Sequence, residues 1–290
     1  MTLNRAPKAA TAAVPTTPAQ QVGRPARSER RLPGWATGVL GAVVVIGLWW
    51  LGAATVFRNV GSMPGGAIPT PGDVFNQLVT DGPSFYLPHL TVTVQEAATG
   101  FLWGNALALL LAGLVLVVPR VEKIALQIAV ITYCVPIVAI GPIAYIVIGA
   151  PKSGDPSGTA VFLAALSVFF TTVVGSLVGL KAADAASLDI VTAYGGTRFT
   201  QLRLVRVIAG LPSVLSALQV AAPAAFLGAI LGEYLGGVER GLGIAMLVAG
   251  SSANVDRVWS LALVAGATAG LGYAVFAVIS RLITPWARAA

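Results

Sequence analysis

The sequence has little charge and almost none of the residues that build metal or disulfide sites. Only 10% of its 290 residues are Asp, Glu, Lys or Arg, whereas a soluble domain carries about 25%. Cysteine and histidine each occur once, as Cys134 and His89. Neither a disulfide framework nor a Cys/His metal site is therefore available. These absences make a zinc or haem enzyme unexpected and favour a surface that meets lipid.

What the chain has instead is long apolar stretches. Apolar residues make up 56% of it, and the mean hydropathy is +0.83. A helix needs about 20 apolar residues to cross the hydrocarbon core of a bilayer. The pattern predicts an all-α membrane protein with six transmembrane helices, at about residues 35–57, 92–118, 124–149, 159–180, 212–236 and 259–283.

The first 34 residues differ from the rest of the chain. They are rich in Ala, Pro, Thr and Arg and lack apolar periodicity, which predicts a disordered cytoplasmic tail at residues 1–34 and a transmembrane domain at residues 35–290. The first apolar run begins too far along the chain for a signal peptide. We therefore expect it to be retained as an anchoring helix.

The basic residues predict the orientation of the chain. With the N-terminus inside, 14 of the 18 Lys and Arg residues fall in inside segments and 4 in outside segments, or 8 against 4 without the tail. Positively charged loops prefer the cytoplasmic side. We expect a multi-pass protein of the cell (plasma or inner) membrane with both termini in the cytoplasm.

Two outside connections carry short apolar pieces. Residues 58–87 hold several prolines and a short amphipathic piece at residues 73–79. Pro88 is expected to break the helix just before the second predicted span. Residues 237–258 hold an apolar piece at residues 242–249 that is too short to span. Such a piece lies in the interface or dips back into the protein, where its backbone groups are satisfied.

Small residues recur every four positions in the second and fifth predicted spans. This spacing lets helix backbones approach closely. Packing within one subunit is favoured over a seam between two subunits. The positions are Gly100, Gly104, Ala108 and Ala112, and Ala221, Ala225 and Ala229.

The connection between the fourth and fifth spans, at about residues 181–211, is long, basic and partly apolar. Leu188, Val191 and Val205 are expected to pack against the bundle, while the arginines face water or an acidic partner. Gly195 and Gly196 predict a break that makes a helix–turn–helix. On physical grounds an ordinary cytoplasmic loop and a docking segment remain equally good interpretations.

A motif in this loop resembles one in a known family. Asp189, Ile190 and Val191 stand where the motif has Glu-Ala-Ala, and Gly195 follows at the right spacing. Val205 takes the Ile position, whereas residues 207–208 replace its Leu-Pro. A Leu-Pro at residues 211–212 matches one that members carry downstream.

Further stretches agree in order and spacing. Residues 68–75 resemble the segment before the second span in that family, residues 89–101 resemble the opening of that span, and residues 232–243 resemble the end of the fifth span. Over about residues 65–285 the chain is similar to the binding-protein-dependent ABC importer permeases, in particular the nitrate, sulfonate, taurine and pyrimidine-precursor subfamily.

The resemblance implies a type I ABC importer permease of six spans, with a cytoplasmic coupling helix between spans four and five. It implies a second permease subunit, identical or related, a dimer of ABC ATPases, and an extracytoplasmic substrate-binding protein. The chain has no phosphate-binding loop, so ATP and Mg²⁺ belong to the partner ATPase. No cofactor and no enzyme activity are expected in this chain. The residues implied in ATPase coupling are Asp189, Ala193, Tyr194, Gly195, Gly196, Arg198 and Arg203.

Two carboxylates lie near or within the spans, Glu96 and Glu233. A carboxylate inside a bilayer is costly and must be paired, protonated or next to water. Either the two reach the interface, or they act near an outer gate. Aromatic residues are further candidates for lining the translocation pathway, although most such residues only pack. These candidates are Tyr133, Phe169, Phe170 and Phe226.

Two other classes of protein remain as alternatives. A secondary transporter or channel, not coupled to an ATPase, is compatible with six spans, although the sequence shows no inverted repeat and no central cluster of charges. An intramembrane enzyme needs a nucleophile and a base or metal ligands within the spans. One histidine and one cysteine argue against the enzyme.

Overall fold

The structure is a computed structural model that describes residues 33–58, 60, 66–152 and 155–288. Every regular element in these residues is helical. The chain divides into a small unit that ends at Val45 and a large unit that begins at Ile46. Apart from positions 33 and 34, the predicted tail lies outside the described residues.

The first helix, α1 (Gly34–Ala54), is apolar along its whole length. Its last part belongs to the large unit, where Trp49 contacts Pro69 and Trp259. The Trp49 indole Nε1 donates a hydrogen bond to the Pro69 carbonyl oxygen at 3.1 Å. Its ring also stacks on Trp259, with 5.6 Å between the ring centroids.

The longest helix, α2 (Pro71–Val117), contains the amphipathic piece and the second span as one element. A capping box between Thr70 and Asp73 starts it. The chain kinks at Gly82, whose φ of 67° is open to glycine. The prediction that Pro88 breaks the helix is wrong, because the helix runs through it and the break falls six residues earlier.

The third predicted span is not one straight helix. After the short helix η1 (Pro119–Val121), α3 (Glu122–Cys134) and α4 (Ile137–Ile148) meet at an angle of 96°. Val135 is extended there (φ −75°, ψ 125°). A residue before proline disfavours the helical conformation, and Pro136 itself has no N–H to continue the ladder. The sequence prediction missed this break.

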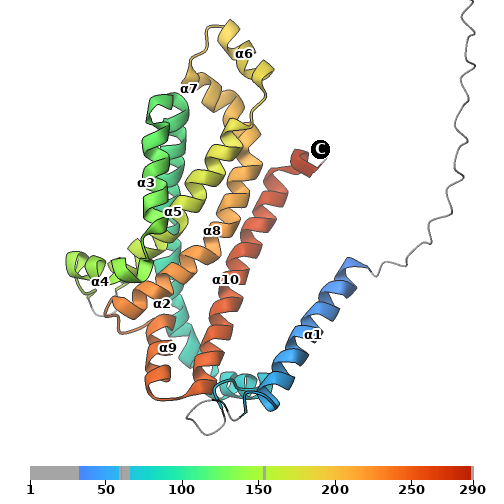
Figure 1. The fold of residues 1–290 in the computed structure, drawn as a ribbon, viewed down its shortest axis with the longest axis vertical. Helices are drawn as coiled ribbons and strands as arrows, with labels where there is room; N and C mark the ends of the chain where they lie inside the picture. Colours follow the sequence, from blue (N-terminus) through green and yellow to red (C-terminus); the bar gives the residue numbers. More distant parts are fainter. Residues whose placement is uncertain (1–32, 59, 61–65, 153–154, 289–290) are drawn as a thin grey trace, which may run out of the picture. The chain divides into compact units, whose positions relative to one another are not determined.

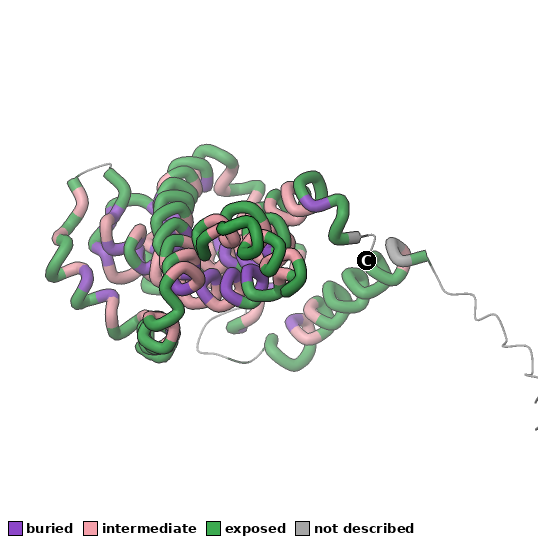
Figure 2. The backbone as a smooth tube through the Cα atoms, turned by 90° about the horizontal axis from the view of Figure 1, so that it is seen from above, coloured by how far each residue is buried: buried purple, intermediate pink, exposed green. Residues whose placement is uncertain are grey.

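The centre of the large unit is formed by α5 (Gly158–Lys181) and α8 (Val207–Leu235), with α2 against both. Figure 2 shows the buried residues gathered inside this bundle and exposed residues around it. A Cβ at Gly104 would overlap the backbone of Ala165, and one at Gly232 would overlap that of Ala160. The predicted small residues of α2 and α8 are all buried, so packing within one subunit is confirmed.

The fifth predicted span begins earlier than expected. After α6 (Ala185–Ala193), the chain forms α7 (Arg198–Gln201), a five-residue π-helix η2 (Leu202–Arg206), and then α8 without a break. The helix therefore starts at Arg198, not near residue 212. Pro212 lies inside this helix and does not end it.

The remaining helices are α9 (Leu242–Ser251), α10 (Val255–Ile283) and η3 (Pro285–Arg288). The prediction that residues 242–249 are too short to span is confirmed by the ten-residue length of α9. Five described helices are long and apolar enough to cross a membrane, or six if the bent α3–α4 pair counts as one span. Figure 1 places α6 and α7 at one end of the bundle and α9 at the other.

Candidate functional site

A row of polar side chains on α2 faces the start of α9. His89, Thr93 and Glu96 follow one another at spacings of four and three residues, which puts them on one face of the helix. Thr93 and Glu96 have no exposed surface. Together with Ser157 and Glu233 they form what we call the capping cluster.

The capping cluster satisfies the first N–H groups of α9. The amide of Gly241 donates to His89 Nδ1 at 3.1 Å, that of Leu242 to Thr93 Oγ1 at 2.9 Å, and that of Gly243 to Glu233 Oε2 at 2.5 Å. The first N–H groups of a helix have no partner within the helix. Side chains of α2 and α8 supply these partners, so α9 is fixed to the bundle at its N-terminus.

The same cluster also holds the start of α5. The Ser157 amide donates to Glu96 Oε1 at 2.6 Å, and the Ser157 hydroxyl caps α5 by accepting from the Ala160 amide. Thr93 donates its hydroxyl to Glu233 Oε1 at 2.5 Å, which joins α2 to α8. Four helices therefore meet at two carboxyl groups that are wholly buried.

Glycine is required at two of these positions for space. A Cβ on Gly243 would lie within 3.0 Å of Glu233 and of the Ile230 carbonyl oxygen. One on Gly241 would overlap the Glu233 carboxyl group, and the φ of Gly241 is 152°. The glycines let the backbone of α9 come close enough for Glu233 to accept its amide.

An ion pair joins α2 to α10 next to this cluster. Arg257 donates through Nε to Asp81 Oδ2 at 2.9 Å and through Nη2 to Asp81 Oδ1 at 2.5 Å. The Tyr86 hydroxyl lies 2.8 Å from Ser260 Oγ and donates to Asp81 at 3.2 Å. The guanidinium also lies over the Phe85 ring, 5.1 Å from its centroid. The bidentate ion pair and the Tyr86–Ser260 hydrogen bond hold the kinked end of α2 against the start of α10.

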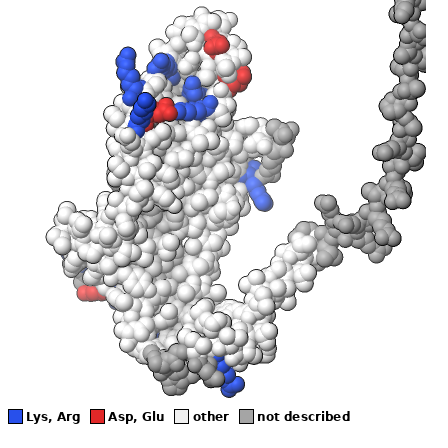
Figure 3. Space-filling view, in the orientation of Figure 1, with Lys and Arg blue, Asp and Glu red and all other residues white. Residues whose placement is uncertain are grey.

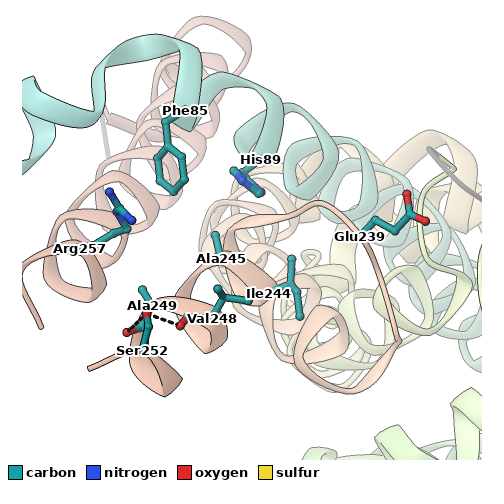
Figure 4. A pocket seen from close by; sticks show the side chains of 9 residues that line it. All are labelled: Phe85, His89, Glu239, Ile244, Ala245, Val248, Ala249, Ser252 and Arg257. Atoms are coloured by element: carbon teal, nitrogen blue, oxygen red, sulfur yellow. Dashed lines mark hydrogen bonds between the residues drawn. The ribbon is translucent and has the colours of Figure 1, made fainter. Parts of the chain in front are cut away.

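A cavity of about 140 Å³ lies between these two groups of contacts. Figure 4 shows Phe85 and His89 of α2 on one side and the small apolar residues of α9 on the other. Because His89 Nδ1 accepts an N–H group, the neutral ring carries its proton on Nε2. The cavity thus combines an apolar floor with polar groups at its rim. It is lined by Phe85, His89, Glu239, Ile244, Ala245, Val248, Ala249, Ser252 and Arg257.

The loop at residues 181–211 forms the predicted helix–turn–helix. Asp184 caps α6 by accepting from the Ser187 amide at 3.1 Å. After α6 the chain turns at Gly195, whose φ is 79°, and Thr197 then caps α7. Gln201 fixes the corner, since its Nε2 donates to Leu188 O at 3.1 Å and to Thr192 Oγ1 at 2.9 Å.

Most of the residues predicted for this loop lie on its surface. Leu188, Val191 and Val205 are half-buried, and Val191 lies against Gly196 of the same loop. Tyr194 is 90% exposed, and a Cβ at Gly195 would meet open space. Figure 3 shows that the basic side chains gather at this end of the bundle, while its middle carries almost no charge. The exposed predicted residues are Asp189, Ala193, Tyr194, Gly195, Arg198 and Arg203, and Gly196 is half-buried.

The predicted lining aromatics do not gather in one cavity. Tyr133 of α3 is exposed and stacks on Phe170 of α5, with 4.5 Å between the ring centroids. Phe169 packs against the core shared by α2, α3 and α5. Phe226 is buried in another core and lines an apolar groove between α2, α8 and α10. These residues therefore form two separate groups.

Sequence reasoning singled out Glu96 and Glu233 but not their partners. Neither carboxyl is exposed on the surface of the protein. His89, Thr93 and Ser157 were not predicted as site residues. Helical spacing from residue 89 to residue 96 was the signal that could have linked the first three residues of the cluster.

Comparison with known proteins adds independent findings. The sequence model of the family described as "Binding-protein-dependent transport system inner membrane component" matches residues 104–289. This stretch includes α8, α9 and the loop at residues 181–211.

Three curated proteins are similar over most of their lengths. A probable ABC transporter permease protein of Haemophilus influenzae is 28% identical, over 78% of this chain and 86% of its own. A putative aliphatic sulfonates transport permease protein of Bacillus subtilis is 24% identical, over 96% and 93%. A formylaminopyrimidine transport permease protein of Halalkalibacterium halodurans is 25% identical, over 76% and 85%.

Proposed function

The chain belongs to the binding-protein-dependent transport system inner membrane components, and we infer that it forms the translocation pathway of an ATP-driven importer. It is the membrane-spanning permease subunit of an ABC-type importer. Partners of this family in general are an ATPase and a substrate-binding protein. The observation that carries the proposal is the family match, which spans the helices around both ends of the bundle.

We propose that the loop at residues 181–211 is the site where the ATPase docks. Both helices of the loop are capped, and Gln201 fixes the corner between them. The loop can therefore move as a unit when the ATPase moves, without unfolding. It still leaves Tyr194 and Phe199 largely exposed next to arginines. Exposed aromatic and basic residues together are typical of a surface that a protein partner covers.

The loop is also connected to the spans by continuous structure. The helix that starts at Arg198 continues through η2 into α8 and ends at Leu235, two residues beyond Glu233. Arg206 donates through Nη1 to the Leu180 carbonyl oxygen at 3.2 Å, which ties the helix to the end of α5. A movement of the loop is therefore expected to act on α5 and α8, the two central helices.

We place this loop in the cytoplasm and α9 on the outer side. The basic residues support this orientation by the positive-inside rule, with both termini in the cytoplasm. On this orientation the cavity beside α9 faces the arriving binding protein, and the capping cluster lies where an outer gate must close. Glu96 and Glu233 then act as positioning residues of the gate, through the helices whose first amides they accept.

The solute is proposed to be a small organic molecule. The names of two relatives include aliphatic sulfonates and formylaminopyrimidine, which share small size and polar groups. The cavity beside α9 has room for a molecule of that size, with an apolar floor and donors at Arg257 and His89. ATP hydrolysis is assigned to the partner ATPase and none to this chain. The proposed assembly has two permease subunits.

The test is co-purification with a candidate ATPase encoded next to the gene. We expect wild-type chain to retain the ATPase in detergent, and Gly195→Asp and Arg198→Asp to lose it while remaining monodisperse. Arg58→Asp is the matched control, since Arg58 is exposed and distant in sequence from the loop. Equal retention by all four chains would sink the docking proposal. If no ATPase binds wild type, transport by the isolated chain in vesicles would instead support a secondary transporter.

A further inference from the structure

Glu96 and Glu233 are buried acids without a basic partner. Both have no exposed surface, and neither forms an ion pair within the described residues, where the salt bridges are Lys181–Glu122 and Arg257–Asp81. Ionisable groups inside membrane bundles are rare because their desolvation is costly. Two carboxylates that meet without a cation therefore call for an explanation beyond packing.

The two carboxyl groups converge on each other. Thr93 and Glu96 lie on the same face of α2, and Thr93 bonds to Glu233 while Glu96 bonds to Ser157 of α5. Ser157, whose amide bonds to Glu96, also lies against α8 beside Glu233, since a Cβ at Gly236 would come within 2.6 Å of the Ser157 hydroxyl oxygen. Gly232 and Gly236, on either side of Glu233, have no side chain and so let α8 approach the first residues of α5 closely. The two acids thus lie at one junction of four helices, α2, α5, α8 and α9.

The donors at this junction are one too few. Glu96 Oε1 accepts from the Ser157 amide, Glu233 Oε1 from the Thr93 hydroxyl, and Glu233 Oε2 from the Gly243 amide. Glu96 Oε2 is fully buried and has no protein donor among the described residues. An ionised carboxylate only accepts hydrogen bonds. A proton on one of the two groups supplies the missing donor and removes the repulsion between two like charges.

We propose that Glu96 and Glu233 form a proton-binding site, and that the proton they share holds α5 and α9 onto α2 and α8. The proton comes from water and makes one of the carboxylates a carboxylic acid, which donates its O–H to the other carboxylate. The pair then carries a single negative charge. That charge faces the first amides of α5 and α9, where helix N-termini favour it.

Few other ionisable groups face the pair. On α2 the neighbour is His89, which is engaged with the Gly241 amide, and on α8 it is Tyr234. The connecting segment carries Glu239 and Arg240, and α4 brings Tyr145 next to Gly237. No residue of α9 is ionisable, and the only such residue of α5 is Lys181 at its far end. The segment before α5 also carries Lys152 and Asp155. Among the described residues no basic side chain forms an ion pair with either acid.

The shared proton makes the outer gate sensitive to pH, and this consequence rests on the proposed function. When the pH rises and the proton leaves, two carboxylates face each other across the α2–α8 contact. Their repulsion weakens the hold on the amides of Gly243 and Ser157. Helix α9 lies between Gly241 and Ala253, both with positive φ, so it can shift as one piece. The importer is then expected to lose its outer closure in alkaline medium.

The direct test is infrared spectroscopy of the purified chain in lipid. At neutral pH we expect the carbonyl stretching band of a protonated carboxyl group, absent from Glu96→Gln and from Glu233→Gln. Glu122→Gln is the matched control, because Glu122 is part of an ion pair of partly exposed side chains, and it must keep the band. Absence of the band from wild type, or its persistence in both cluster variants, would overturn the proposal.

A titration of wild type keeps the test independent of whether the variants fold. The band is expected to disappear as the pH is raised, and the thermal unfolding midpoint to fall over the same range. In Glu96→Gln, where an amide N–H replaces the shared proton, the fall in midpoint is expected to vanish. A midpoint that falls equally in both proteins overturns the proposal. Neither measurement needs an ATPase, so a failed co-purification leaves this result standing, and the reverse also holds.

Discussion

The two ends of the bundle differ in how far their residues are buried and paired within the chain. At the end formed by α9, amides and carboxyls are buried and pair with one another through the capping cluster. At the end formed by α6 and α7, no residue of either helix is buried, and Tyr194 is 90% exposed. In the first region all of these groups except Glu96 Oε2 have partners within the chain. The second is built and capped but lacks a covering surface.

Because of this difference, we expect substitutions at one end to change stability and substitutions at the other to change binding. A buried donor that loses its acceptor carries the full cost of its desolvation, so changes at the α9 end act on folding. An exposed side chain loses little when it is truncated, so changes at the α6 end act on association. The comparison can be tested by matched substitutions at the two ends, ordered here by the size of their expected effect on stability.

The largest loss is expected for Glu233→Ala. It removes the acceptor of both the Thr93 hydroxyl and the Gly243 amide, and leaving buried donors unpaired costs about 3 kcal/mol. Thermal unfolding in detergent measures the loss. Asp189→Ala at the exposed end is the control and should change stability by no more than about 0.5 kcal/mol. Similar shifts for the two variants would contradict the comparison.

The next effect is expected at the close contact of α8 with α5. Gly232→Ala places a Cβ against the Ala160 backbone, and overpacking of this kind costs about 1–3 kcal/mol. Gly195→Ala meets open space and carries only the strain of positive φ, about 1–2 kcal/mol. Unfolding midpoints of both variants decide the order. A larger loss at Gly195 would mean that the turn, not the helix contact, is the tighter site.

A smaller effect is expected at the Asp81–Arg257 pair. The Asp81 side chain is 5% exposed but that of Arg257 is 35% exposed, so solvent screens part of the attraction. A double-mutant cycle with Asp81→Ala and Arg257→Ala should give a coupling energy of about 1 kcal/mol. The coupling should fall in high salt. A coupling that salt does not change would indicate packing through Phe85 instead.

The smallest effect on stability is expected for Tyr194→Ser in the loop at residues 181–211. Because the ring is exposed, unfolding should shift by no more than about 0.5 kcal/mol. ATPase retention, however, should drop, since aromatic residues at interface centres carry much of the binding energy. Binding measured on immobilised permease checks this. Unchanged retention would place the docking surface elsewhere on the loop.

Much of the fold could be predicted from the chain itself. Long apolar stretches predicted the helices now seen as α1, α2, α5, α8 and α10, because crossing a bilayer requires about 20 apolar residues. Gly195 predicted the turn between α6 and α7, since positive φ favours glycine. The burial of the small residues in α2 and α8 also followed from their spacing.

The misses concern prolines and side-chain partners. Pro88 and Pro136 look alike in sequence, yet the helix runs through the first and breaks before the second. Which of them breaks a helix depends on whether neighbouring helices satisfy the freed carbonyl groups. The partners of Glu233 lie 140 residues away at Thr93 and ten away at Gly243. Residues so far apart in the chain form no local sequence pattern from which their contact could be predicted.

The sequence by itself determined a helical membrane protein, most of its long apolar stretches and the place of its exposed loop, because these depend on local hydropathy and on residues with special backbone freedom. Only the tertiary structure decided that Glu96 and Glu233 meet, that α9 is held by its first amides, and that the predicted aromatics fall into two groups. These are long-range contacts between helices. They follow from which faces pack together, and the glycines at the α5–α8 contact allow that packing to be close.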